Sequence, residues 1–206
     1  MVKPTSATTL SLFPLQAVLF PGGLLNLKVF EARYLDLMAA CLREHRPFGV
    51  VALRQGSELR NDNARVDFES TGVLAELLDV DSTQAGILQV RCRGTHRFRV
   101  RASRQQRDGL WLAESTALPD DAVVAPDGTL VETVRSLANA IASMKAQGTQ
   151  PFLEPYALDD AGWVANRWCE ILPIPIGAKQ RLMELSDPAV RLQLVDEFLR
   201  SKGVVN

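Results

Sequence analysis

The chain has 206 residues, of which 47% are hydrophobic and 23% are charged, and its formal net charge is −1 at pH 7. A chain of this length and apolar content can bury a core as one large domain or two small subdomains, which excludes a disordered protein. A net charge near zero excludes a general electrostatic attraction to nucleic acid or to anionic membranes.

The cysteines and the N-terminal residues bear on the compartment. Cys41, Cys92 and Cys169 are odd in number and widely spaced, which does not suit a disulfide framework. Residues 1–9 are polar, and the apolar stretch after them is interrupted by prolines, so it fits neither a secretory signal nor a membrane span. We therefore expect a cytoplasmic protein without a membrane partner.

The first elements predicted along the chain lie between residues 15 and 46. Residues 15–20 form an apolar run that predicts a short buried strand. Pro21-Gly22 then supplies a fixed φ followed by a residue that is free to adopt φ > 0, which predicts a turn. Residues 25–29 alternate at strand period. The apolar period becomes helical from Phe30, and this predicts a helix over residues 31–46.

Strands are also predicted at residues 48–53, 72–79 and 109–114, and a hairpin is predicted over residues 88–102. In the hairpin, apolar and polar residues alternate on both sides of a turn at Gly94-Thr95-His96. This pattern predicts that one face is buried and that the other face is lined with arginine. The arginines of that face are Arg91, Arg93, Arg97, Arg99 and Arg101.

The second half of the chain has helical patterns. Residues 119–128, rich in proline and aspartate, predict a connection between the two halves. Thr129 and Glu132 match a capping box at the start of a helix that ends near Gly148. Three further helices are predicted at residues 160–172, 176–185 and 187–202, with Pro188 at the first position of the last one. We therefore expect a helical bundle.

Several short blocks occur in a fixed order along the chain. They are Pro14-Leu15, Leu19-Phe20-Pro21-Gly22, Phe30-Glu31 with Arg33-Tyr34, Phe48-Gly49-Val50, Gly72-Val73, Gly94 with Arg97-Phe98, Lys179-Gln180 with Leu182-Met183-Glu184, and Arg191-Leu192. From about residue 10 to residue 200, this order resembles the Lon protease N-terminal domain family, also called the Lon substrate-binding domain. The resemblance implies an α+β fold, with a PUA-like β-barrel and one helix over residues 1–118 and a helical bundle over residues 119–206.

The resemblance also implies a function. Lon substrate-binding domains recognise polypeptides, so the expected partners are unfolded or exposed polypeptide segments, with a protease or chaperone as a further partner. Full-length Lon enzymes join this domain to an ATPase and a serine-lysine protease, whereas this sequence has no G-x-x-x-x-G-K-[ST] loop to hold nucleotide phosphates. We therefore expect a stand-alone, non-enzymatic substrate-recognition or adaptor protein.

Catalytic, metal and cofactor sites are not predicted. His45 and His96 lie far apart in the sequence, and no C-x-x-C pair is present, so clustered metal ligands are lacking. The same two histidines limit nucleophilic catalysis, because a general base must lie within hydrogen-bond reach of its nucleophile. We expect no catalytic residue, no metal and no cofactor, and keep an unrecognised hydrolase as a third alternative.

Four residues are candidates for contact with a polypeptide: Arg33 and Tyr34 at the start of the first helix, and the large aromatic residues Trp111 and Trp163. Trp168 lies five positions after Trp163, so the two rings cannot point the same way from one helix. The alternative interpretation, which we favour for the tryptophans, is that all of these residues pack in the core, because large aromatic side chains bury readily.

The arginine face has three interpretations. Seven arginines and no carboxylate lie from Arg91 to Arg107. We favour a face that is solvated or paired with acidic residues of neighbouring strands. RNA is the alternative ligand, bound by Arg91, Arg93, Arg97, Arg99 and Arg101, because clustered arginines also form phosphate-binding surfaces. An acidic protein partner is the third possibility, and salt dependence separates RNA from an apolar polypeptide.

Overall fold

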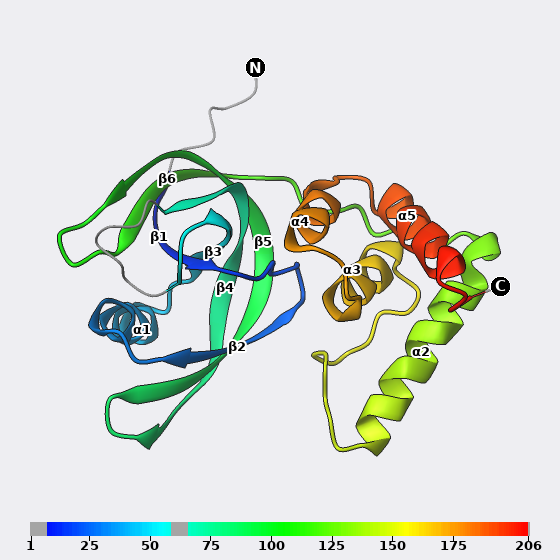
Figure 1. The fold of residues 1–206 in the computed structure, drawn as a ribbon, viewed down its shortest axis with the longest axis horizontal. Helices are drawn as coiled ribbons and strands as arrows, with labels where there is room; N and C mark the ends of the chain where they lie inside the picture. The colour runs from blue at the N-terminus through cyan, green and yellow to red at the C-terminus, as the bar shows by residue number, and fades with distance from the viewer. Residues whose placement is uncertain (1–7, 59–65, 206) are drawn as a thin grey trace. The chain divides into compact units, whose positions relative to one another are not determined.

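The computed structural model describes residues 8–58 and 66–205, and the chain divides into two compact units, residues 1–119 and 120–206 (Figure 1). Within the described residues, the first unit contains six strands and the helix α1, and the second contains four α-helices and a short 3-10 helix. The chain is therefore an α+β protein with a C-terminal group of helices, as the sequence predicted.

The six strands of the first unit form one sheet in the order β2-β5-β4-β3-β1-β6, and β6 also pairs with β5. This last pairing closes five of the strands into a barrel, with β2 attached to β5 outside the ring. Strands β1 and β3 are parallel, and all other neighbours are antiparallel. The strands are β1 Thr8–Leu15, β2 Leu24–Val29, β3 Phe48–Gln55, β4 Asp67–Gln84, β5 Ile87–Gln105 and β6 Trp111–Ala117.

The long strand β5 joins two neighbourhoods of the sheet. Its first half pairs with β2, from Leu88 to Arg93, and its second half pairs with β6, from Phe98 to Gln105. Phe98 packs in a buried cluster of the barrel interior that also contains Leu10, Leu12, Val51 and Ala113. Inward-facing side chains therefore fill this barrel, as in other small barrels.

The strand predicted at residues 15–20 is wrong. The strand ends at Leu15, because β1 is the segment that pairs with both β3 and β6. Leu19 and Phe20 are buried without belonging to a strand, so their apolar character reflects core packing. The turn predicted after them is confirmed, since Gly22 has a φ of 74°.

The hairpin turn predicted at residues 94–96 is also wrong. Strand β5 continues through these residues, and the turn of the hairpin lies at Ala85-Gly86, between β4 and β5. Gly94 instead lies against the turn that follows β1: its carbonyl accepts from the Gly22 N–H at 2.8 Å, and its own N–H donates to the Gly23 carbonyl at 2.9 Å. A glycine is needed there because a second backbone passes directly over it.

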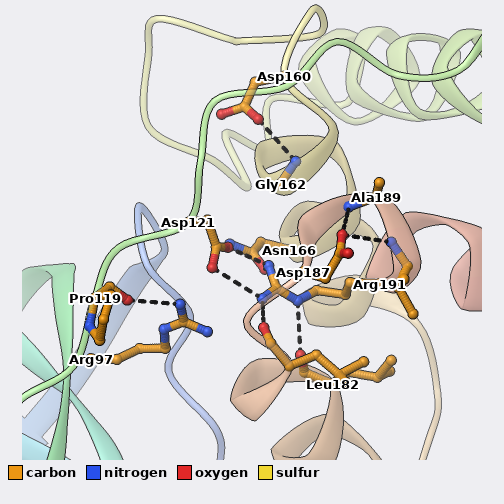
Figure 2. Close-up of polar contacts among 12 residues, drawn as sticks. Arg97, Pro119, Asp121, Asp160, Gly162, Asn166, Leu182, Asp187, Ala189 and Arg191 are labelled. Carbon is orange, nitrogen blue, oxygen red and sulfur yellow. Dashed lines mark hydrogen bonds and ion pairs between the residues drawn. The ribbon is translucent and has the colours of Figure 1, made fainter.

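The helix predicted at residues 31–46 is confirmed as α1 Ala32–Glu44, and the four helices predicted in the second half are also confirmed. The second unit contains η1 Gly128–Leu130, α2 Val131–Ala146, α3 Ala161–Ile171, α4 Ile176–Glu184 and α5 Pro188–Ser201. Asp160 caps α3 by accepting from the Gly162 N–H at 2.9 Å, and Asp187 caps α5 by accepting from the Ala189 N–H at 2.9 Å (Figure 2).

The capping box predicted at Thr129 and Glu132 is wrong. The Asp127 carboxylate caps η1 by accepting from the Thr129 N–H at 2.8 Å, and Glu132 pairs with Arg135 instead. In the core of this unit, α3 packs against α5 and donates a hydrogen bond from Trp168 Nε1 to the Thr133 carbonyl of α2 at 3.1 Å.

Candidate functional site

Arg33 and Tyr34 lie inside the first unit, where they hold α1 in place. Arg33 is 7% exposed, and its guanidinium donates to the backbone carbonyls of Gly109 (2.8 Å) and Glu58 (3.2 Å). The Tyr34 ring stacks on Phe13, with ring centroids 3.9 Å apart. Burial raises the pKa of Tyr34 to about 12. Both side chains are thus occupied by contacts within the barrel unit.

The three tryptophans differ in exposure. Trp168 is buried, whereas Trp111 and Trp163 are each partly buried. Trp111 packs edge-on against Phe68, with centroids 5.2 Å apart, on the outside of the barrel cluster. Trp163 lies next to Tyr156, and the Arg167 guanidinium lies 5.7 Å from its ring centroid. Trp111 belongs to the barrel unit and Trp163 to the helical unit.

The five arginines of β5 do not form one face. Arg97 is 4% exposed and donates to the Pro119 carbonyl at 3.0 Å (Figure 2). Arg93 forms an ion pair with Glu76 of β4 at 2.9 Å. Arg101 donates to Thr116 Oγ1 at 3.2 Å, while Arg91 and Arg99 are exposed and form no ion pair in the part of the chain that the structure describes. A bulge between Gly94 and Arg97 interrupts the alternation that the sequence suggested.

A hollow lies in the helical unit, where η1 faces α5. It has a volume of about 640 Å³. Apolar side chains of Leu130, Ala161 and Leu192 line it, together with charged side chains of Asp127 and Glu197. Six of the eleven lining residues are polar or charged, so the hollow offers apolar contact and polar groups side by side.

Exposed apolar side chains accompany this hollow. Val190, which lines it, is 43% exposed, and so is Leu194, one helical turn further along α5. Residues four apart lie on one face of a helix, so these two form an apolar patch on α5. The sequence did not predict this patch, because it does not show which apolar residues of α5 are buried; in the structure Leu192, Val195 and Leu199 are the buried ones.

A smaller hollow of about 280 Å³ lies in the barrel unit, between the end of α1 and strand β4. It is lined by Leu42, His45 and Leu77, among others, and Leu42 is 47% exposed. The charged groups around it are largely paired, since Arg46 contacts Glu44 at 2.6 Å. This hollow therefore offers apolar contact and little free charge.

A buried polar network connects the segments of the helical unit. Arg191 of α5 is 1% exposed, and its guanidinium donates to the Asp121 carboxylate at 2.6 Å and to Asn166 Oδ1 at 3.0 Å (Figure 2). It also donates to the backbone carbonyls of Leu182 and Leu185. These bonds tie α5 to α3, to the end of α4 and to the segment that precedes η1.

A second ion pair of the helical unit contains a carboxyl group, that of Glu170, whose pKa is raised. The Arg167 side chain is fully buried and contacts Glu170 at 2.7 Å. Burial raises the pKa of Glu170 to about 7, although the positive charge of Arg167 opposes the shift. A folded-state pKa above the ordinary value means that the folded protein holds a proton that the unfolded chain releases.

We expect the stability of the helical unit to fall as the pH rises from about 4.5 to about 7, because over this range only the folded state keeps the Glu170 proton. Glu170→Gln removes this titration and retains the shape of the side chain. Urea unfolding of both proteins at several pH values is the measurement: the stability of the native protein should decline relative to that of the variant. Parallel pH profiles would contradict the expectation.

Residues 8–58 and 66–205 contain no group of three or more His, Cys, Asp or Glu side chains that could hold a metal ion. None of the helices in these ranges has both the length and the apolar character that crossing a bilayer requires. The three cysteines are buried thiols, and burial raises the pKa of Cys92 and Cys169 to about 12.

Comparisons with known proteins agree on one family. Residues 9–201 match the family described as the ATP-dependent protease La (LON) substrate-binding domain. The chain is 26% identical over 199 residues to Lon protease 2 of Myxococcus xanthus, a match that covers 94% of this chain and 24% of that protein. The chain thus spans about a quarter of the length of this curated relative.

Two solved structures are similar. A Lon N-terminal domain protein from Xanthomonas campestris is 31% identical with a TM-score of 0.72, and the match covers 91% of this chain and 96% of that one. The N-terminal domain of a Mycobacterium avium complex Lon protease is 16% identical with a TM-score of 0.65, covering 94% and 98% respectively. The second likeness concerns the fold alone.

Proposed function

The chain belongs to the family of LON substrate-binding domains, and on that premise we propose that it binds exposed apolar segments of unfolded polypeptides. Binding of this kind requires solvent-exposed apolar side chains beside a concave surface, because the bound segment gains by removing its own apolar groups from water. The protein would act as a substrate-recognition or adaptor module, with a protease or chaperone as the downstream partner.

The observation that carries the proposal is the apolar patch of α5. Val190 and Leu194 are both 43% exposed beside a hollow of about 640 Å³ whose lining includes further apolar side chains. Exposed apolar groups that are clustered at a concave surface are a feature of interaction sites, whereas scattered ones are ordinary. Trp163 of the same unit is a further candidate contact, as is Trp111 of the barrel unit.

The same proposal includes the absence of catalysis. The sequence contains no phosphate-binding G-x-x-x-x-G-K-[ST] loop. The Cys92 and Cys169 thiols are poor nucleophiles, because their raised pKa values keep them protonated near neutral pH. We place the activity in the cytoplasm, a reducing compartment in which such thiols persist.

The test is binding of a fluorescently labelled model protein that has been reduced and alkylated so that it stays unfolded. We expect a Kd of roughly micromolar order that changes little between low and moderate salt, because apolar contacts are not screened. ATP hydrolysis and casein cleavage are measured in parallel, and neither should be detected. Tight RNA binding that weakens steeply with salt, without binding of the unfolded protein, would overturn the proposal.

A variant tests the apolar patch. Val190→Asp combined with Leu194→Lys removes both apolar side chains, preserves the net charge and places opposite charges four residues apart, so the helix is not weakened. We expect binding to weaken by about tenfold or more, since two exposed apolar contacts are lost. Val123→Asp is the matched control: Val123 is 84% exposed and does not line the hollow, so its replacement should leave binding unchanged.

A further inference from the structure

Strand β2 is the end strand of the sheet. It pairs with β5 along one side, and within residues 8–58 and 66–205 no strand pairs with its other side. An end strand presents a row of backbone N–H and C=O groups with the spacing of a strand. The chemical group that satisfies such a row is the backbone of another extended polypeptide.

The sheet has a second open edge, on the part of β4 that extends beyond β3, and it is less regular than the edge of β2. Strand β3 stops pairing with β4 at Ala75, and beyond that point β4 has two register shifts against β5 and carries Asp79 and Asp81. Bulges and charged residues are the usual means by which proteins prevent pairing at an edge. In contrast, β2 keeps an unbroken register over its six pairs with β5, from Leu24 to Val29, contains neither proline nor glycine, and has Lys28 as its one charged residue.

The side chains of β2 determine which extended polypeptide segment could pair with it. Leu27 and Val29 are buried on the inner face, and Leu25 is partly buried on the same face. On the outer face, Asn26 and Lys28 are exposed. A strand added beside β2 therefore places alternate side chains next to apolar neighbours and the others next to polar ones.

The charge of Lys28 favours acidic residues on the outer face of an added strand. Arg91 of β5 lies directly opposite Asn26 on this face, but Asp79 of β4 lies opposite Arg91 on its other side, so Lys28 is the positive charge next to the open edge. Neither Lys28 nor Arg91 forms an ion pair within the described part of the chain. A carboxylate on the outer face of an added strand would complement the charge of Lys28.

We propose that β2 binds an extended polypeptide segment as an additional strand, and that the preferred segment alternates apolar residues with acidic ones. This inference rests on the proposed function and adds a second contact for the polypeptide, on the barrel unit. The backbone bonds supply affinity that is independent of sequence, while the alternating side chains supply the preference. Pairing with a second copy of β2 is disfavoured because it brings a second lysine to the same edge.

The first experiment uses a peptide of about seven alternating valine and glutamate residues, a usual strand length. Backbone amide hydrogen exchange of β2 is measured with and without the peptide. Alternate residues of β2 have their N–H groups directed to the open edge, so exchange should slow at alternate residues only. A version of the peptide that is N-methylated at every residue keeps the side chains and loses the donors, and it should bind at least about tenfold more weakly.

The second experiment reverses the charge of the edge. Lys28→Glu should weaken binding of the valine-glutamate peptide by about threefold or more and strengthen binding of a valine-lysine peptide. Arg107→Glu makes the same change of charge in the turn between β5 and β6, where Arg107 is exposed, and should leave the preference unaltered.

The outcomes separate the two proposals. Binding of the unfolded protein without protection of β2 and without an effect of Lys28→Glu would overturn strand addition and leave the proposed function standing. Absence of binding to both the unfolded protein and the peptides would overturn the proposed function, and strand addition with it. Protection of β2 that appears without peptide, together with dimer formation, would assign the edge to a second copy and overturn the commitment to a polypeptide segment.

Discussion

Replacing Arg191 with methionine is expected to lower the free energy of unfolding of the helical unit by about 3–5 kcal/mol. The guanidinium is 1% exposed and donates to the Asp121 carboxylate, to Asn166 and to the carbonyls of Leu182 and Leu185. Methionine fills a similar volume but donates no hydrogen bond. The variant therefore leaves a carboxylate with little exposure and several carbonyls without this donor.

Urea unfolding, followed by tryptophan fluorescence and circular dichroism, measures this effect. Arg135→Met is the matched control, because the Arg135 side chain is 64% exposed and pairs with Glu132 on the helix surface. Loss of that exposed pair should cost about 0.5 kcal/mol or less. Equal losses in the two variants would show that the Arg191 network does not hold the helices together.

Gly94→Ala is expected to destabilise the barrel unit by about 2–4 kcal/mol. A Cβ at this position would lie 2.3 Å from the Phe20 carbonyl oxygen and 3.0 Å from Leu19 Cγ. Since the nearest atom belongs to the backbone, a side chain cannot rotate away to make room. The crossing segment must move, and its two hydrogen bonds with Gly94 are then weakened.

Thermal and urea unfolding of the Gly94→Ala protein test this expectation, with Gly128→Ala as the control. No atom outside the immediate chain lies within 4 Å of a Cβ built on Gly128. Alanine there should therefore be neutral or slightly stabilising, because it restricts the unfolded chain. A Gly94→Ala protein as stable as the control would mean that the close approach is not required for folding.

Features that depend on residues close together in the sequence were predicted well, whereas features that depend on distant segments were not. The ends of α3 and α5 are determined by adjacent residues, since Asp160 and Asp187 each cap the helix that follows them, and these helices were predicted closely. In contrast, the predictions at Gly94 and at the residues before Pro21 were wrong, because distant segments determine the structure there. A glycine in a polar stretch is locally compatible with a turn, and only the distant segment that crosses Gly94 explains its presence.

The sequence predicted the family, but it did not predict which residues form the candidate site. The blocks of residues that identify the family are largely structural: Arg33 and Tyr34 anchor α1, and Arg191 joins the helices. Such residues indicate a fold without indicating where a ligand binds. The exposed pair Val190 and Leu194 has no local mark in the sequence, because an apolar residue on a helix is exposed or buried according to the packing of its neighbours.

The closure of the barrel has a consequence for biosynthesis. Thr8 pairs with Ser115, and β1 also pairs with β3, so the first strand cannot complete its hydrogen bonds until the last strand has left the ribosome. During that interval the apolar strand β1 has an unsatisfied edge. Contacts between such distant segments slow folding and prolong exposure to aggregation. A nascent chain of this protein is therefore expected to need protection until Ala117 has emerged, whereas α2 to α5 can form through short-range contacts afterwards.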